Sequence, residues 1–442
     1  MSSFLPASPS GPSAPVLMSI NERTAPTAPV RTTVVHRKHR GPGQWWRSAV
    51  ICDVPGAVDS QQLADVEQLA DRLTAIGLTA VSLFIGDPLL VRSTVLADFI
   101  SVMHQRDLKV IIRLRGARIP TSDPATLDLE DGITTLIGKV RALVAAGVDG
   151  VDLGLIEAPV AAATEADPGD IQHRFCQFVR VLRREFGDGD SAPILTAEVP
   201  SADPTEALEH FGHNTFHHLR DGALSSSTWN AQSLAEAITT SYEVRERTGR
   251  EPSWVWSGLH LADTPAEVIR AAHPAGHLSF ADPTWESGAS QSRRDAMALL
   301  ACALPGSVHV TLGDIGARIV IDQRVRRQWS EDSTLDRRLE LARRILDVRK
   351  ERNMGLSSLS TVEGLAWVRA GVTVLMVSGV MVVVNTSPAP IEVPGEHHLL
   401  VASTGEDGTM VTPGQSFALA GESCAWFVTA RIRAEEGNFG EE

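Results

Sequence analysis

The chain has 442 residues, of which 43% are hydrophobic, which is enough apolar material for two or three domains with large cores. Its formal net charge is −14 at pH 7, and its arginine clusters, such as Arg343-Arg344, are interleaved with acidic or apolar residues. This charge pattern argues against nucleic acid or an anionic membrane as the main partner.

The cysteines and the hydropathy pattern indicate the cellular compartment of the protein. No stretch approaches the roughly 18 to 20 apolar residues that a membrane-spanning helix requires. The N-terminal residues lack the basic and apolar regions of a secretory signal. Four cysteines, Cys52, Cys176, Cys302 and Cys424, are far apart and show no metal-ligand spacing. We therefore expect a cytoplasmic protein, with no membrane contact and with buried, reduced thiols.

Residues 1–43 are rich in Pro, Ser, Thr and Ala without a sustained period, so they are predicted to be a disordered tail. From residue 44 onward, short apolar runs alternate with amphipathic helical segments. Strands are predicted at residues 48–54, 79–86, 108–116, 148–155, 192–200, 252–260 and 306–313. Such alternation implies right-handed crossovers and a parallel sheet, and the number of predicted strands is close to eight. Residues 44–354 are therefore predicted to form a (β/α)8 TIM barrel.

The sequence pattern changes again near Gly355. Residues 355–430 hold short β-rich runs separated by Gly, Pro and Asn-Thr-Ser, with no helical segment between them. This region is predicted to be an antiparallel β-sandwich, an all-β C-terminal domain. Residues 431–442 are predicted to be an acidic tail.

Several of these segments resemble the α-amylase superfamily, glycoside hydrolase family 13. Residues 44–54, "QWWRSAVICDV", look like the opening barrel strand of bacterial α-glucosidases and trehalose synthases. Further segments resemble the third, fourth, fifth, seventh and eighth strand motifs, and the terminal sandwich resembles the family's C-terminal domain. The resemblance runs from Trp45 to Val428 in the order and spacing of the family.

The resemblance also implies where the catalytic residues should be. Glu198 in "LTAEVP" matches the general acid of the fifth strand. Gly154 stands at the position of the aspartate nucleophile, and Asp152 at that of the arginine that orients it. His260 stands at the position of the aspartate that stabilises the transition state. Two of the three catalytic carboxylates of the family are therefore absent.

The third-strand motif has also changed, since Arg113 and Arg118 stand where the family has Asp and His. Asp152 is a poor substitute nucleophile, because two residues along a strand displace a carboxylate by about 6.6 Å. A misplacement of about 1 Å can already cost 100-fold in rate. We expect Asp152 to form a salt bridge with Arg113 on the adjacent strand, within an ionic cluster with Arg115, Arg118 and Glu198 that fills the former pocket.

Two further features distinguish the chain from active family members. Only about fifteen residues, near 117–132, follow the third strand where those members insert domain B, so domain B is predicted to be much reduced. His213, His217 and His218 suggest a zinc site, but they lack nearby acidic or Cys ligands and align with the family's sixth-strand region. No metal and no cofactor are therefore expected.

These changes predict a catalytically degenerate α-amylase-like protein, a pseudoenzyme. We expect it to be a non-hydrolytic partner or regulatory subunit of an active homologue in carbohydrate metabolism. Its predicted partner is thus an amylase-superfamily protein, in a hetero- or homo-oligomer. One alternative is an active α-glucoside hydrolase or transglycosylase with a rearranged site. Another is a glycan-binding module for an α-glucan or oligosaccharide.

Overall fold

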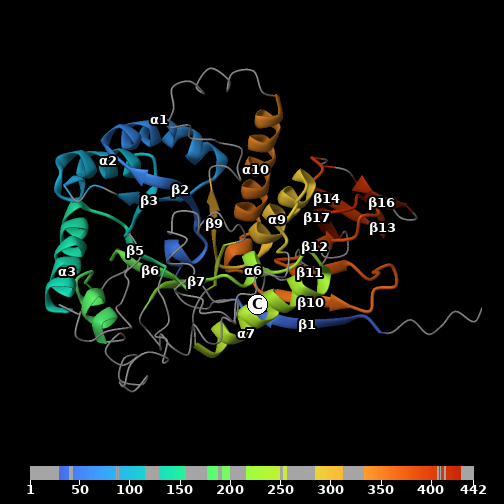
Figure 1. The fold of residues 1–442 in the computed structure, drawn as a ribbon. Helices are drawn as coiled ribbons and strands as arrows, with labels where there is room; N and C mark the ends of the chain where they lie inside the picture. The colour runs from blue at the N-terminus through green and yellow to red at the C-terminus, as the bar shows by residue number, and fades with distance from the viewer. Residues whose placement is uncertain are drawn as a thin grey trace, which may run out of the picture.

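A computed structural model describes most of the chain (Figure 1). The described residues are 29–38, 43–85, 87, 89–114, 129–155, 177–187, 192–199, 216–248, 252–255, 284–311, 333–405, 408, 410–412 and 415–429.

Eight parallel strands form the first sheet, in the order β7-β6-β5-β4-β3-β2-β9-β8. The strands are β2 (Val50–Val58), β3 (Ala80–Ile85), β4 (Lys109–Arg113), β5 (Gly150–Leu155), β6 (Ile194–Val199), β7 (His218–Asp221), β8 (Ser253–Trp254) and β9 (Ser307–Thr311). The two ends of this order come together, because β7 and β8 are in contact and His218 Nδ1 of β7 lies 3.4 Å from Ser307 Oγ of β9, the residue paired with Ser253 of β8. The predicted (β/α)8 barrel is thereby confirmed as a nearly closed one.

Amphipathic helices cover the outside of the barrel, and α1 shows why they form where they do. Asp59 and Gln62 make a capping box at its start, and Gly77, with φ of 101°, ends it in the left-handed conformation. The helices are α1 (Ser60–Ile76), α2 (Thr94–His104), α3 (Leu129–Ala146), α6 (Ala223–Ser226), α7 (Ala231–Thr248), α9 (Gln291–Ala303) and α10 (Ser333–Glu351), with 3-10 turns η1 (Trp45–Arg47), η2 (Leu90–Arg92) and η4 (Met354–Leu356). Only residues 114–128 lie between β4 and α3, which leaves little room for a domain B.

A second, antiparallel sheet has the order β1-β10-β11-β12-β17-β14-β15, and β13 pairs with β16 beside it. The strands that follow the barrel are β10 (Leu359–Glu363), β11 (Val372–Val377), β12 (Val380–Asn385), β13 (Ile391–Pro394), β14 (His397–Ala402), β15 (Met410–Val411), β16 (Ser416–Leu419) and β17 (Ser423–Thr429). Their inner residues, among them Val383, Val393 and Phe427, make a core of their own. The predicted all-β C-terminal domain is confirmed.

The sheet also contains a strand from the other end of the chain. β1 (Arg31–His36) pairs antiparallel with β10, with Arg31 opposite Glu363. The prediction of a disordered tail over residues 1–43 is therefore wrong for these residues. Their sequence, "RTTVVH", is rich in β-branched residues, but the partner strand is so distant in sequence that no local pattern reveals the pairing.

The barrel and the β domain are packed against each other. Glu422, at the start of β17, accepts hydrogen bonds from Ser290 Oγ at 2.7 Å and from Arg293 Nε at 3.0 Å, both at the start of α9. Thr373 of β11 donates to the carbonyl of Ala231 in α7 at 3.0 Å. Arg344 of α10 donates to the carbonyl of Leu400 in β14 at 3.1 Å. Three barrel helices thus support one face of the second sheet (Figure 1).

Glu422→Gln is expected to destabilise the protein by about 1 kcal/mol at neutral pH. Burial alone would raise the pKa of Glu422, but hydrogen bonds from Ser290 and Arg293 outweigh it, and the folded-state pKa is lowered. This stabilisation is present above the unfolded-state pKa and is lost as pH falls through the folded-state pKa. Urea unfolding should be measured at pH 7 and at a pH well below the usual glutamate pKa of about 4.3. The difference in unfolding free energy between the parent protein and Glu422→Gln should be smaller at the lower pH. Exposed Glu396→Gln is the control and should change little at either pH.

Among the described helices, none combines the length and the apolar character needed to span a bilayer.

Candidate functional site at the barrel mouth

The interior of the barrel changes from apolar to polar along the strands. At the N-terminal end, Trp46 packs with Ile51, Ile111 and Ile194 and closes the barrel. Beyond this layer the buried residues are mostly polar, and they include Asp53, Ser82, Arg113, Asp152, Thr196, Arg220 and His309. TIM barrels are usually filled with branched apolar side chains, and their functional residues lie at the C-terminal ends of the strands. The polar layer is therefore the candidate site.

A buried ion pair joins β5 to β7. Asp152 Oδ2 lies 2.7 Å from Arg220 Nη2, and the two side chains are 1% and 2% exposed. Glu198, on β6 between them, lies 3.6 Å from the same Nη2 and is 12% exposed. Burial alone would lower the pKa of Arg220, but the charges of Asp152, Glu198 and Asp53 outweigh it and hold that pKa above its usual value. Arg220 therefore stays charged and counterbalances the carboxylates around it.

Gly154 occupies a distorted part of β5. Its φ is +74°, and the pairing of β5 with β6 shifts register between Asp152 and Leu155. The amide of Gly154 donates to Asp152 Oδ1 at 2.8 Å, so this local turn is held by the same carboxylate that pairs with Arg220. A left-handed φ strains any residue with a Cβ atom. The backbone at this position is therefore shaped for glycine and disfavours an aspartate.

A second buried pair lies across β2 and β9. Asp53 Oδ2 is 2.8 Å from His309 Nδ1, and the two side chains are 6% and 2% exposed. His218 lies in the same interior, and burial, followed by the charges of His309 and His217, holds its pKa well below the usual value. His218 is therefore neutral at pH 7.

The structure places four of the residues selected from the sequence at one end of the barrel: Arg113, Asp152, Gly154 and Glu198. Arg113 is next to Asp152 in the sheet register, and its Nη2 lies 3.4 Å from the carbonyl of Val54. His260, Arg115 and Arg118 lie outside the described residues, so their predicted places remain predictions.

Sequence analysis missed Arg220, although it is the ion-pair partner that the structure gives Asp152. Its signal was alternation along β7, which turns His218 and Arg220 to the same face. Asp53 and His309 were missed because each is a single polar residue within an apolar run.

Two of the histidines that suggested zinc, His217 and His218, make other contacts. His217 Nδ1 accepts a hydrogen bond from the Leu195 amide at 2.9 Å, and its ring lies edge-on to Trp46. Burial, together with the charge of Arg183, lowers its pKa to about 4. His213 lies outside the described residues. Within the described part of the chain, no group of His, Cys, Asp and Glu side chains could hold a metal ion.

No protein-family model matches the sequence, and no curated protein is significantly similar to it. Solved structures are similar in fold. An α-amylase from Anoxybacillus is 12% identical, with 87% of this chain and 98% of that chain covered, at a TM-score of 0.53. The maltogenic α-amylase AmyB from Thermotoga neapolitana is 10% identical, with coverages of 86% and 98% and a TM-score of 0.54. Ttha1563 from Thermus thermophilus is 13% identical, with coverages of 87% and 100% and a TM-score of 0.55.

The class that these comparisons define is the α-amylase fold, a TIM barrel followed by an all-β domain. The similarity extends over the whole length of these proteins and not over the barrel alone. At such low identity it establishes the scaffold, and the activity must be argued from the residues in the barrel.

Proposed function

We propose that this chain is a non-hydrolytic member of the α-amylase superfamily that acts as a partner or regulatory subunit in carbohydrate metabolism. The observation that carries this proposal is Gly154. It stands where the resemblance places the nucleophile, and its φ of +74° disfavours any side chain there. A retaining glycosidase needs two carboxyl groups about 5–5.5 Å apart, one of them the nucleophile.

The other charged groups at the mouth support the same proposal. Asp152, the nearest carboxylate on β5, is 1% exposed and paired with Arg220. Attack on a sugar would require it to leave this pair and to give up the hydrogen bond from the Gly154 amide. Glu198 lies beside the same guanidinium. The acids are therefore held in a structural network, which suits a scaffold that has lost its chemistry.

A specific observation favours sugar binding as a second candidate. Several buried polar atoms of the barrel interior have no hydrogen-bond partner within the described part of the chain, among them Ser82 Oγ, Thr196 Oγ1, Arg220 Nε and Arg220 Nη1. Buried polar groups normally find partners, and hydroxyl groups of a ligand or water molecules would supply them. Calorimetric titration with a malto-oligosaccharide separates this candidate from a purely structural role for the polar layer.

The direct test is hydrolysis of maltose, sucrose, trehalose and an aryl α-glucoside by the purified protein. We expect no turnover above that of Glu198→Gln, since loss of a nucleophile costs several orders of magnitude in rate. Turnover that Glu198→Gln abolishes would contradict the proposal and favour an active, rearranged site. The matched control is Glu185→Gln, on the barrel exterior, which should behave as the parent protein does.

A further inference from the structure

β1 is an open edge of the second sheet. It stands first in the strand order, and no described strand pairs with its outer side. The opposite edge, β15, has only two residues, whereas β1 has six. Natural proteins blunt their sheet edges with short strands, charges or prolines. β1 instead exposes valine, with Val34 56% exposed and Val30, just before the strand, 59% exposed.

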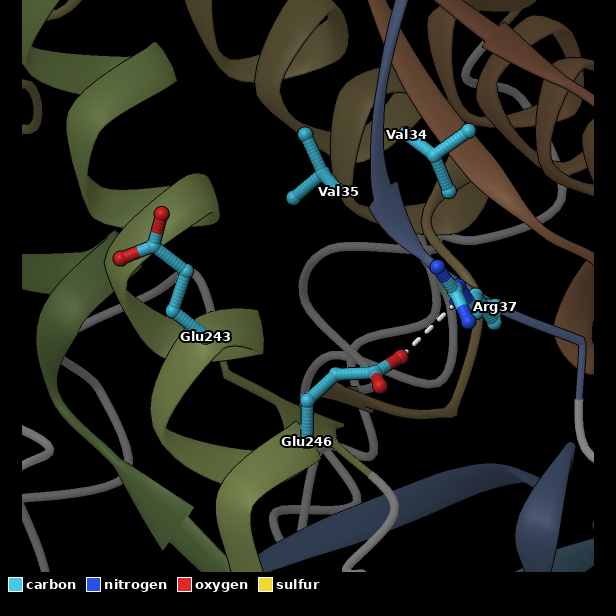
Figure 2. Close-up of a pocket in the computed structure, with 5 residues that line it drawn as sticks. All are labelled: Val34, Val35, Arg37, Glu243 and Glu246. Atoms are coloured by element: carbon cyan, nitrogen blue, oxygen red, sulfur yellow. Dashed lines mark hydrogen bonds between the residues drawn. The ribbon is translucent and has the colours of Figure 1, made fainter.

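A cavity of about 420 Å³ lies beside this edge (Figure 2). Val34 and Val35 both line it, although Figure 2 shows their side chains pointing in different directions. A cavity lined by successive residues of a strand lies along the backbone edge, not on one face of the sheet. Its other wall is α7, which contributes Glu243 and Glu246, one helical turn apart.

The C-terminal end of β1 is held against this wall by several contacts. Glu246 Oε1 accepts from the Arg37 amide at 2.9 Å and lies 3.4 Å from His36 Nδ1. His36 stacks on Tyr242 with ring centroids 4.7 Å apart. Pairing with β10 is regular from Arg31 to Val34 and shifts register before His36. Residues 31–35 precede the contacts of His36 and Arg37 with α7, so they are the part of the strand that another strand can join along its outer edge.

We propose that β1 is an interface with a second copy of this chain, formed by antiparallel pairing of the two β1 edges about a two-fold axis. The strand can pair with itself when Thr33 of one copy lies opposite Thr33 of the other. Arg31 of the second copy then lies opposite Val35, on the same side of the sheet, because directly opposite residues share a face. Its guanidinium would enter the cavity, whose charged lining is Arg37, Glu243 and Glu246 and is therefore negative in sum, so the charges are complementary at both ends.

The expected strength of this interface is modest. Stable interfaces bury about 1,200–2,000 Å², and a short strand pair with one ionic contact at each end is at the lower limit of that range. The chain also carries a net charge of −14, so two copies repel each other at low salt. The full-length protein should therefore show a reversible monomer–dimer equilibrium that depends on its concentration.

Analytical ultracentrifugation with charge reversals tests the proposal. Arg31→Glu and Glu243→Arg should each weaken dimerisation by about tenfold or more, because each places like charges together. The double variant, which restores opposite charges, should recover most of the affinity. Glu236→Arg, on an exposed part of the same helix outside the cavity, is the matched control and should leave the dimer unchanged. Val34→Lys should also dissociate the dimer, by placing a charge on the edge.

Two results would overturn the inference: a protein that is monomeric at every concentration, or a dimer that none of these substitutions weakens. Arg31 lies opposite Glu363 within its own sheet, so circular dichroism must show that Arg31→Glu remains folded. If that variant unfolds, Glu243→Arg and Val34→Lys decide whether the β1 edge forms the dimer interface. The interface does not depend on the chemistry of the barrel. Absence of a dimer would therefore not bear on the proposed loss of hydrolysis. A positive hydrolysis assay would likewise not bear on the interface.

Discussion

Arg220→Met is expected to destabilise the protein by about 3–5 kcal/mol, the usual cost of removing one partner of a buried ion pair. Methionine keeps much of the side-chain volume but leaves Asp152 buried without its countercharge. Urea unfolding at neutral pH measures the loss. The control is Arg343→Met on α10, where the ion pairs with Glu340 and Asp347 are exposed and little change in stability is expected.

A second variant identifies the cause of that loss. In Arg220→Met with Asp152→Asn, the uncompensated charge is removed, so the double variant should be more stable than Arg220→Met alone. If Arg220→Met loses less than about 1 kcal/mol, the pair does not organise the barrel mouth as its burial implies. The same result would remove one support for an inert, structural role of Asp152.

Restoring two missing acids, with Gly154→Asp and His260→Asp together, is not expected to create a glycosidase. Hydrolysis of an aryl α-glucoside should remain several orders of magnitude below ordinary enzyme rates. Aspartate at residue 154 would have to adopt a φ near +74°, at a cost of about 1–3 kcal/mol, or rebuild the bulge in β5. The Asp152–Arg220 pair would still occupy the mouth.

Gly154→Asn is the folding control for this experiment, since asparagine tolerates the left-handed region better than most residues. It separates backbone strain from the added carboxylate. Ordinary glycosidase rates in the double variant would show that the site needs only its two acids, and that neither the backbone at Gly154 nor the ion pair excludes a substrate.

Much of the fold follows from local patterns in the sequence. Seven barrel strands were predicted where the structure has them, because apolar runs of β-branched residues between amphipathic helices are a local signal. β7 was assigned only through its resemblance to a family motif, since His218, Arg220 and Asp221 break the apolar pattern. β1 could not be recognised, because its stabilising partner β10 is distant in the chain.

The site was only partly predictable, for a related reason. The motif positions of Asp152, Gly154 and Glu198 are implied by the resemblance to family motifs, each of which lies along a single strand. The pairing of Asp152 with Arg220 depends on which side chains meet across a closed barrel, and β5 and β7 are separated by β6. The prediction from the sequence paired Asp152 with Arg113 on the adjacent strand, within a cluster that also held Arg115 and Arg118. Such contacts depend on the direction and reach of side chains across the closed barrel, and the alternation along a single strand does not reveal them.

The pairing of β1 with β10 also affects how the chain can fold during its synthesis. The strand Arg31–His36 leaves the ribosome long before β10, and at about 5–20 residues per second the delay is on the order of tens of seconds. Throughout that interval a β-branched segment has no sheet to join, although the barrel between the two strands can already fold. Completion of the C-terminal domain must therefore await the return of the first strand, and a truncation near the N-terminus would damage the opposite end of the chain.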